Sequence, residues 1–470
     1  MRETKAWSKS VTHNPQEFTL TPLSVITGKI PPGLQGSLYR NGPARLSVGN
    51  QRVGHWFDGD GAILAVHFRG DSATATYRYV QTQGYEAETE AGKYLFPNYG
   101  MKVPGAFWNS WGKPVKNSAN TSVLALPDKL LALWEGGNPY GLDLETLETL
   151  GTDSLSELTL QDTYSAHYKQ DYHTKDIFNF GFSVGATNRL NLYRSDSTGK
   201  IKQRGSTEIK SFTLVHDFVM AGKYLVFCLP PVRLNIVPVA LGLSSFSESM
   251  TWRPQEGTQI LVFDRDSFGL VCEIDTDSWY QWHFANGCVL EDGSIMLAMA
   301  AYEDFQTNQY LRVVPTGKTK TSAECALWEL RLNPQTGKVI SREKVLDRHC
   351  EFPLVMPQKV GLPWQYTYLS VSKPGVEIAE EIFGEIARFD HKNNSLMVSN
   401  LGENRYGSEP IYAPDSGNHN KGWLLSVVYD GNTDNSEVWI YQSDYLEEPY
   451  CRLALPSVIP PSFHGTWKPA

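Results

Sequence analysis

Seven side chains with metal-binding chemistry recur at comparable points of the chain. They are four histidines and three glutamates: His167, His216, His283, His464, Glu135, Glu351 and Glu409. Imidazole nitrogens are good ligands for first-row transition metals. A metal-bound histidine usually donates its other ring N–H to a carboxylate, which fixes the orientation of the ring. The set therefore predicts a site in which four histidines bind a divalent metal and three glutamates offset its charge without touching it.

Each of these residues has a simpler interpretation when it is taken alone. A single histidine on an apolar strand is more often a hydrogen-bonded core residue than a ligand, and a single buried glutamate often belongs to a structural ion pair. The stretch HWFDGDG, residues 55–61, is a competing metal-site candidate through Asp58 and Asp60. We prefer to interpret it as a tight turn, with glycines where a positive φ is needed. The metal-site prediction therefore depends on the whole set.

Seven β-hairpins supply the framework for these residues. A hairpin is predicted where two strands of alternating apolar residues flank a turn of Asp, Asn, Ser or Gly. Because an isolated hairpin is only marginally stable in water, each is expected to pack against further strands. Seven such units predict an all-β fold, a seven-bladed β-propeller. The hairpins span residues 64–79, 140–151, 190–205, 260–274, 327–343, 385–398 and 438–455.

The framework brings the seven side chains together. The first strand of each propeller unit lines the central channel, so residues just upstream of each hairpin are expected there. Three of the histidines precede the third, fourth and fifth hairpins, and the three glutamates precede the second, sixth and seventh. The fourth, His464, lies in PSFHGTW, residues 461–467, which is expected to be a strand that closes the ring, with Phe463 and Trp467 in the core.

Composition narrows the class of protein. The 470 residues carry a net charge of −9, which argues against a nucleic-acid partner. No uncharged apolar run is long enough to span a membrane, and the first residues lack the apolar core of a signal peptide. The six cysteines are scattered, as expected of free thiols in a reducing compartment. We therefore expect a cytoplasmic location, and a monomer is the default expectation for the oligomeric state.

The chain resembles the carotenoid cleavage oxygenases, non-haem iron enzymes built on a seven-bladed propeller. The resemblance implies a single propeller domain over residues 1–470, with a helical and loop cap over the active-site face and a substrate tunnel formed by inserted loops. It covers nearly the whole chain through an ordered set of motifs. These are IPPGLQGSLYRNGPARL (30–46), HWFDGDG (55–61), KNSANTSVLAL (116–126), LALWEGG (131–137), SAHYK (165–169), VHDF (215–218), HFAN (283–286), CEFPLV (350–355), SEPIYAP (408–414) and SFHGTW (462–467).

The resemblance also implies roles for particular residues. The four histidines would bind one Fe(II) per chain, and the three glutamates would accept their ring N–H groups. Thr121, in ANTS, matches a threonine whose methyl group crowds one remaining coordination position. Phe284 stands where the family often has a second histidine, which leaves His283 as the ligand. The family splits a carbon–carbon double bond with O2 into two carbonyl products.

The expected substrate is an apocarotenoid, cut at the central 15,15′ bond to release retinal. Trp134, Tyr302 and Phe352 match positions that line the substrate path in similar enzymes. Trp134 stands where the stilbene-cleaving branch has a lysine, which favours a carotenoid-type substrate. Cleavage of full-length carotenoids at another bond, cleavage of stilbenes, isomerisation and a non-enzymatic scaffold are the alternatives.

The resemblance further implies contact with a membrane. The apolar segment PVRLNIVPVALGLSSFSESM, residues 231–250, matches a patch that dips into one leaflet around the tunnel mouth. The alternative is a helix packed on the face of the propeller. An enzyme attached peripherally to a membrane would fit the first interpretation.

Overall fold

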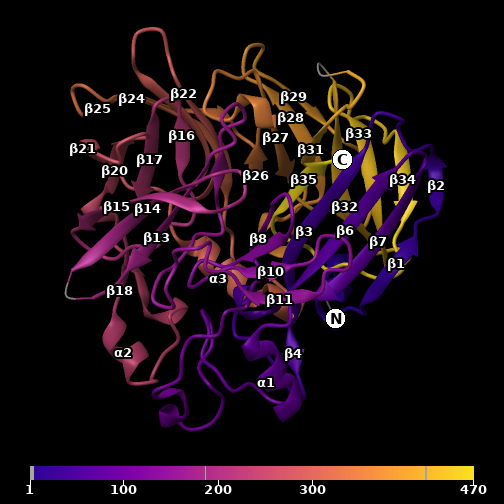
Figure 1. Ribbon diagram of the computed structural model, residues 1–470, viewed down its shortest axis with the longest axis horizontal. Coiled ribbons are helices and arrows are strands. Elements are labelled where there is room, and N and C mark those ends of the chain that lie inside the picture. The colour runs from indigo at the N-terminus through magenta and orange to yellow at the C-terminus, as the bar shows by residue number, and fades with distance from the viewer. Residues whose placement is uncertain (1–4, 186, 419–420) are drawn as a thin grey trace.

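Seven sheets stand around a common centre as the blades of a β-propeller (Figure 1). The computed structural model describes residues 5–185, 187–418 and 421–470. Two small sheets lie outside the blades: β4 (Ser47–Val48) pairs with β5 (Gln51–Arg52), and β18 (Val232–Leu234) pairs with β19 (Met250–Trp252). The predicted all-β, seven-bladed propeller is confirmed.

The first three blades use strands from the first half of the chain and one strand from its end. Blade one contains β1 (Phe18–Pro22), β7 (Ser72–Tyr79), β6 (Asp60–Arg69), β3 (Gly36–Arg45) and β35 (Gly465–Pro469). Blade two contains β8 (Ser122–Ala125), β9 (Leu130–Leu133), β10 (Tyr140–Leu142) and β11 (Thr149–Thr152). Blade three contains β12 (Lys169–Gln170), β13 (Ile177–Ser183), β14 (Asn188–Ser195) and β15 (Ile201–Ile209).

The remaining blades follow in chain order. Blade four contains β16 (Val219–Ala221), β17 (Tyr224–Leu229), β20 (Thr258–Asp264) and β21 (Leu270–Thr276). Blade five contains β22 (Tyr280–Val289), β23 (Ile295–Tyr302), β24 (Cys325–Asn333) and β25 (Lys338–Leu346). Blade six contains β26 (Cys350–Leu354), β27 (Tyr366–Val371), β28 (Glu385–Asp390) and β29 (Ser395–Val398). Blade seven contains β30 (Arg405–Gly407), β31 (Ile411–Pro414), β32 (Gly422–Asp430), β33 (Asn435–Gln442), β34 (Cys451–Ala454) and β2 (Val25–Gly28).

The seven predicted hairpins are strand pairs on the outer side of the seven blades, and in blades one and seven a further strand, β1 or β2, lies outside the pair. Period-two alternation identifies them because one face of each strand packs against a neighbouring blade. In β24, for example, Leu330 and Leu332 are fully buried, whereas Arg331 between them is partly exposed. The inner strands gave a weaker signal because both of their faces are buried, and several are only two to four residues long.

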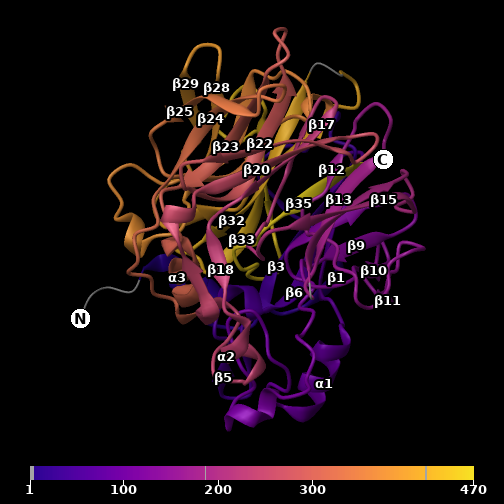
Figure 2. The ribbon, with the colours of Figure 1, turned by 90° about the vertical axis from the view of Figure 1, so that its left-hand side faces the viewer.

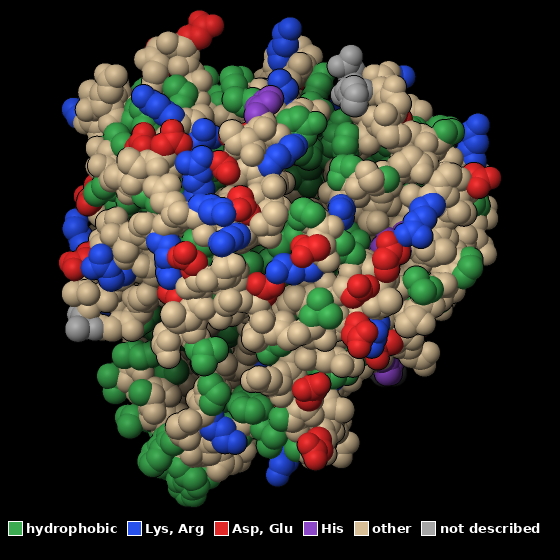
Figure 3. All heavy atoms as spheres, in the orientation of Figure 1, with side chains coloured by type: hydrophobic (Ala, Val, Ile, Leu, Met, Phe, Trp, Pro, Cys, Tyr) green, Lys and Arg blue, Asp and Glu red, His purple; other side chains and the backbone are tan. Residues whose placement is uncertain are grey.

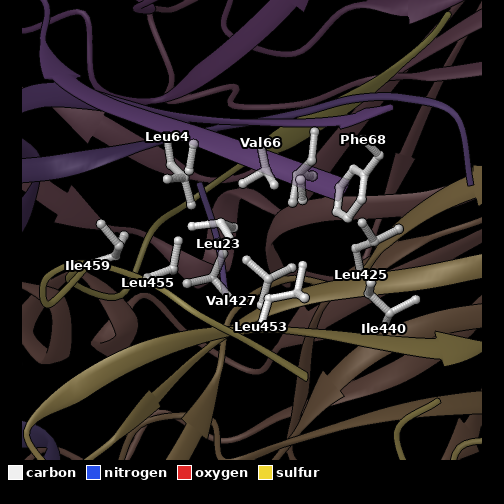
Figure 4. Close-up of a cluster of buried hydrophobic side chains, with 14 of the residues drawn as sticks. Leu23, Leu64, Val66, Phe68, Leu425, Val427, Ile440, Leu453, Leu455 and Ile459 are labelled. Atoms are coloured by element: carbon white, nitrogen blue, oxygen red, sulfur yellow. The ribbon is translucent and has the colours of Figure 1, made fainter. Parts of the chain in front are cut away.

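The ring is closed twice by strands from opposite ends of the sequence. β35 pairs with β3, so that Thr466 lies opposite Tyr39, and β2 pairs with β34 at the outer edge of blade seven. A buried core fills the seam between blade one and blade seven (Figure 4). There Leu64 and Val66 of β6 face Val427 of β32. The predicted closing strand is confirmed.

Insertions between strands form a cap at one end of the propeller. α1 (Gln83–Ala91) lies between β7 and β8, α2 (Ile236–Ala240) between β17 and β20, and α3 (Gln306–Val313) between β23 and β24. Figures 1 and 2 both place α1 and α2 at this end, beyond the blades. In the part of the chain that the structure describes, no helix is long and apolar enough to cross a membrane.

Candidate metal centre and cavity

Four imidazole rings meet where the inner strands converge. The Nε2 atom of His216 lies 2.9 Å from that of His167 and 3.1 Å from that of His283. The Nε2 atom of His283 in turn lies 3.1 Å from that of His464. One ligand atom from each ring lies within 4.8 Å of every other, and three of the four residues are buried. The structure thus brings together the four histidines that the sequence singled out.

Each histidine comes from an inner strand or from the turn that leads into one. His283 lies within β22, and the other three lie one to three residues before a strand: His167 before β12, His216 before β16 and His464 before β35. The residue after His464 has to be small, because a Cβ at Gly465 would lie 2.6 Å from the carbonyl oxygen of Tyr39. Blades three, four, five and one therefore each supply one ring.

Each of the three predicted glutamates contacts the Nδ1 atom of one histidine. The contacts are Glu351 Oε2 to His283 at 2.5 Å, Glu409 Oε1 to His464 at 3.0 Å, and Glu135 Oε1 to His216. Two of these carboxylates are themselves held in place. Tyr302 donates a hydrogen bond to Glu351 Oε1 (3.1 Å), and the backbone N–H of Gly465 donates to Glu409 Oε2 (2.9 Å).

Glu135 reaches the site from a different strand than the sequence predicted. Glu351 lies in the inner strand β26 and Glu409 two residues before β31, but Glu135 lies two residues after β9, the second strand of blade two. Thr121 is the residue that directly precedes the inner strand, β8. The sequence analysis took the strand just upstream of the hairpin as the inner strand of the blade, and this was wrong. In blade two that strand is β9, the second strand, and the inner strand β8 comes one element earlier in the chain.

His167 differs from the other three histidines. Its Nδ1 atom lies 3.9 Å from Asp217 Oδ1, which is beyond hydrogen-bonding distance. Asp217 is instead neutralised by Lys169, whose Nζ atom lies 2.8 Å away. Burial, followed by the neighbouring histidines, holds the pKa of His167 well below its usual value. In contrast, Glu135 raises the pKa of His216 despite a burial effect in the opposite direction.

The carboxylates that contact the histidines, of which Glu351 and Glu409 are buried and Glu135 is partly exposed, outnumber the positive charge beside them. Arg40 is fully buried, and its Nη1 atom lies 3.6 Å from Glu409 Oε2. Burial lowers the pKa of Arg40 to about 10 and raises that of Glu409 to about 7. Three glutamates against one guanidinium leave two negative charges when all of them are ionised. A divalent cation would neutralise the site.

The histidine geometry fits a metal ion. A glutamate at Nδ1 places the ring hydrogen on that atom, so the Nε2 lone pairs of His216, His283 and His464 point toward one another. Lone pairs at this distance repel unless a cation accepts them. Two nitrogens that each lie about 2.1 Å from one ion, at right angles, are about 3.0 Å apart, close to the separations found here. The donor set suits a first-row transition metal.

A cavity of about 610 Å³ adjoins the metal centre. Its wall includes three of the histidines, and it also includes all four of the other residues that the resemblance marked, Thr121, Trp134, Tyr302 and Phe352. The ring of Phe352 stacks on His283, with centroids 5.1 Å apart. Most of the other lining side chains are aromatic or aliphatic, so the cavity suits an elongated apolar molecule.

The HWFDGDG stretch is a turn in the wall of the cavity, and its two aspartates are not part of the histidine cluster. Residues Trp56–Asp58 form a 3-10 turn, as expected, but Gly59 has φ −63° and Gly61 lies in β6, so neither adopts a positive φ. Close packing explains the second glycine, because a Cβ at Gly61 would lie 2.2 Å from the carbonyl oxygen of Ala119. Asp58 accepts a hydrogen bond from Gly100, and Asp60 forms ion pairs away from the histidines.

Residues 231–250 form an exposed apolar surface at the cavity mouth. Val237 is 60% exposed, and Ile236, Leu241 and Leu243 are also exposed. The neighbouring loop adds Trp108, which is 58% exposed, together with Phe107 and Trp111. Trp111 Nε1 donates to the carbonyl oxygen of Leu241 (2.9 Å), which joins the two segments. Figure 3 shows hydrophobic side chains gathered at this end, over α2.

Several residues of the site were missed by the sequence analysis. Phe57, Trp282 and His349 line the cavity, and Arg40 lies behind His464. The guanidinium of Arg40 donates to the carbonyl oxygens of Glu409 (2.7 Å) and Phe463 (3.0 Å). An arginine in an apolar strand was the available signal, since arginine is almost never fully buried unless it is paired.

The fold and the site together define a propeller protein with a candidate four-histidine metal centre that opens on an apolar cavity. Comparison with known proteins identifies the family to which the chain belongs. Residues 11–469 match the family described as retinal pigment epithelial membrane protein, and the chain belongs to this family. Its relatives include carotenoid and apocarotenoid cleavage oxygenases, so the chain is an oxygenase homologue, as the resemblance implied.

Individual relatives span the whole chain. The apocarotenoid-15,15′-oxygenase of Synechocystis is 30% identical over 98% of this chain and 96% of its own length. Resveratrol cleavage oxygenase 1 of Botryotinia fuckeliana is 26% identical over 94% of this chain and 82% of its own. A solved structure of cobalt-substituted Synechocystis ACO superimposes with a TM-score of 0.90 at 28% identity, and covers 99% of this chain and 98% of that one.

Proposed function

We propose that this protein is an Fe(II)-dependent dioxygenase that cleaves a conjugated carbon–carbon double bond of an apocarotenoid. One O2 and one alkene give two carbonyl compounds, so that each oxygen atom ends on one of the two former alkene carbons. The observation that carries the proposal is the convergence of four histidine Nε2 atoms beside an apolar cavity. A propeller that only binds a partner would not need this arrangement.

Iron is proposed as the metal, with one ion per chain. His167, His216, His283 and His464 would hold it, and the two negative charges left when all three glutamates are ionised would favour a divalent ion. The chemistry that ferrous iron supplies when bound is activation of O2 for addition to an alkene. The imidazole donor set also accepts other first-row metals, so the metal itself has to be tested.

The protein's own residues orient the ligands and keep the site dry. Glu135, Glu351 and Glu409 each hold a ring hydrogen on Nδ1, which leaves the Nε2 lone pair for the metal. Aromatic side chains such as Phe352 and Trp282 exclude water from the reacting double bond. Thr121 would crowd one side of the metal and so restrict where the substrate and O2 can lie.

The substrate proposal rests on the cavity and on the relatives. An apolar cavity suits a long polyene, and the relative named apocarotenoid-15,15′-oxygenase favours a retinal-forming cut. Trp134, rather than a lysine, lines the wall beside Glu135, which disfavours a phenolic stilbene. Cleavage of full-length carotenoids or of stilbenes is the alternative, since matched relatives are named for such activities.

Product analysis tests the proposal. The chain is loaded with ferrous iron under anaerobic conditions, mixed with detergent micelles that contain an apocarotenal or a hydroxystilbene, and exposed to O2. Retinal from the apocarotenal, identified by chromatography and mass spectrometry, is the expected result. An aldehyde of another length would mean that a different double bond is cleaved. Cleavage of the stilbene alone would mean that the substrate is a stilbene and not an apocarotenoid. No product from either compound, with no iron retained, would overturn the function.

We also propose that the exposed surface at residues 231–250 inserts into one leaflet of a membrane and so delivers the substrate to the cavity. The exposed Trp108 and Val237 support the proposal, because aromatic and aliphatic side chains enter the interfacial region. Sedimentation with lipid vesicles measures the fraction of protein that is bound to them. Most of this bound fraction should be lost when Val237 and Leu241 are replaced by Ser. A cytoplasmic location and a monomeric state remain predictions, which fractionation and light scattering would test.

A further inference from the structure

One polar side chain faces the cavity without a hydrogen-bond partner for one of its nitrogens. His349 lines the wall one aromatic layer beyond Phe352. Its ring stacks on Phe383 with centroids 4.7 Å apart and an interplanar angle of 16°, and Phe383 packs edge-on against Phe352 at 6.2 Å. Since Phe352 stacks on His283, an unbroken series of aromatic rings joins His349 to the metal centre.

The backbone fixes the tautomer of His349. The N–H of Cys325 donates to His349 Nδ1 at 3.1 Å, so Nδ1 carries the lone pair and Nε2 carries the hydrogen. Burial lowers the pKa of His349 to about 4, which keeps the ring neutral at neutral pH. His349 Nε2 therefore presents a fixed N–H donor.

Two neighbouring hydroxyl groups in the cavity wall are already paired. The hydroxyl of Tyr310 donates to the carbonyl oxygen of Glu381 (2.6 Å), and that of Tyr302 donates to Glu351. Within the described residues, none of the hydrogen bonds involves His349 Nε2. A donor left unpaired in an apolar enclosure costs free energy, and a ligand oxygen placed beside it recovers that cost.

We propose that His349 Nε2 donates a hydrogen bond to an oxygen atom at one end of the substrate, a carbonyl or hydroxyl on an otherwise apolar conjugated chain. This inference rests on the proposed function and adds a specificity-determining residue to it. Apolar walls alone let a polyene slide, so a single polar contact at one end sets its depth. The position of His349 relative to His283 would then decide which double bond lies beside the metal.

Ligand binding tests the inference without turnover. The ferrous protein is kept free of O2 and titrated with an apocarotenal, its alcohol and the matching hydrocarbon, and quenching of tryptophan fluorescence gives each Kd. The wild-type protein should bind the aldehyde and the alcohol about tenfold more tightly than the hydrocarbon, the ratio expected for one hydrogen bond to a buried donor. Equal affinity for all three ligands would overturn the inference with no variant needed.

Two variants identify the donor. H349N keeps an acceptor for the N–H of Cys325 but lacks the Nε2 hydrogen, so it should lose the preference while its hydrocarbon affinity changes less than about twofold. H391N is the matched control, because His391 pairs with Glu329 and Thr367 and is absent from the cavity wall. A preference retained in H349N, or equal weakening of all three ligands, would contradict the role of His349.

The failure of this inference and that of the proposed function are distinguishable. Exposure of the wild-type ferrous protein to O2 in the presence of any of the ligands shows whether it cleaves a double bond. Cleavage with no preference for the oxygen-bearing ligands would leave the function standing and remove only the role of His349. The wild-type protein should cut the two oxygen-bearing ligands, the aldehyde and the alcohol, at the same bond. H349N should give a mixture of product lengths from these two ligands.

Discussion

Two buried groups of titratable side chains lie in this protein, and they are built on opposite principles. The ionic cluster consists of Arg45, Asp60, Glu88 and Lys116. Lys116 Nζ lies 2.9 Å from Asp60 and 2.8 Å from Glu88, and Arg45 Nη2 lies 2.7 Å from Asp60. The metal centre has four histidines and three glutamates against Arg40 alone.

The difference separates a structural cluster from a binding site. Two cations balance two carboxylates in the ionic cluster, and although burial lowers the pKa of Lys116, Asp60 and Glu88 raise it above its usual value. Glu88 also accepts hydrogen bonds from the backbone N–H groups of Leu95 and Phe96, so the cluster fastens the cap to the propeller. The metal centre, when its three glutamates are ionised, is short of positive charge, which a cation from solution would supply. Charge balance therefore distinguishes the two groups where burial does not.

The sharpest contrast is expected from removal of a metal ligand. The Nε2 atom of His283 lies 3.1 Å from those of both His216 and His464, so H283A opens the middle of the ligand set. We expect loss of most bound iron and a fall in turnover of about 1,000-fold, because a catalytic metal contributes several kcal/mol. Atomic absorption and product analysis measure both effects. Wild-type iron content in H283A would contradict the assignment, and H391A is the control.

Removal of one cation from the ionic cluster should act on stability instead. K116M leaves Asp60 and Glu88 buried with Arg45 alone, which is expected to lower the free energy of unfolding by about 3–5 kcal/mol. Urea denaturation measures the change, and iron per folded chain should stay the same. K129M, which removes the partly exposed ion pair with Asp153, should cost about 1 kcal/mol or less. If iron were lost from folded K116M, the two groups would not be independent.

A smaller effect is expected from a carboxylate that touches a ligand and not the metal. E351Q keeps the size of the side chain but weakens the contact with His283 Nδ1. Iron retention against a competing chelator should weaken about 10–100-fold, as changes to such supporting groups commonly do. Unchanged iron retention and rate would count against the role of Glu351. The exposed Glu291 provides the control variant, E291Q.

The smallest effect concerns a buried histidine that belongs to neither group. Burial lowers the pKa of His55 to about 3, so below pH 6.5 the unfolded chain binds a proton that the folded chain does not. The free energy of unfolding should therefore fall by about 1 kcal/mol more in the wild type than in H55N between pH 6.5 and 5.5. Asn retains an acceptor for the N–H of Phe57. Urea titrations of both proteins at the two pH values measure this difference. Equal losses of unfolding free energy in the wild type and in H55N would contradict the lowered pKa of His55.

The sequence predicted the blades and the ligand set for related physical reasons. Outer strands alternate because one face is buried, so all seven hairpins were located, and their order placed the histidines at the inner ends. The position of Glu135 was wrong because short inner strands such as β8, with four residues, carry little pattern. Element order is therefore a better guide to this site than local periodicity.

The ionic cluster and His349 could not be predicted in the same way. Lys116 and Arg45 are residue types that normally face water, and nothing in the sequence pairs them with Glu88. His349 precedes β26 by one residue, and its role depends on a backbone N–H from Cys325, on a different blade. Contacts of this kind arise only from the tertiary arrangement.

The double closure of the ring has a consequence for biosynthesis. β35 is the last blade strand to leave the ribosome, and its pairing with β3, a strand synthesised early, brings the preceding residue, His464, into place. Until that pairing forms, a nascent chain offers at most three of the four ring nitrogens. Stable metal uptake would thus be postponed until translation of the fold is finished, and an incomplete chain would not retain a redox-active ion.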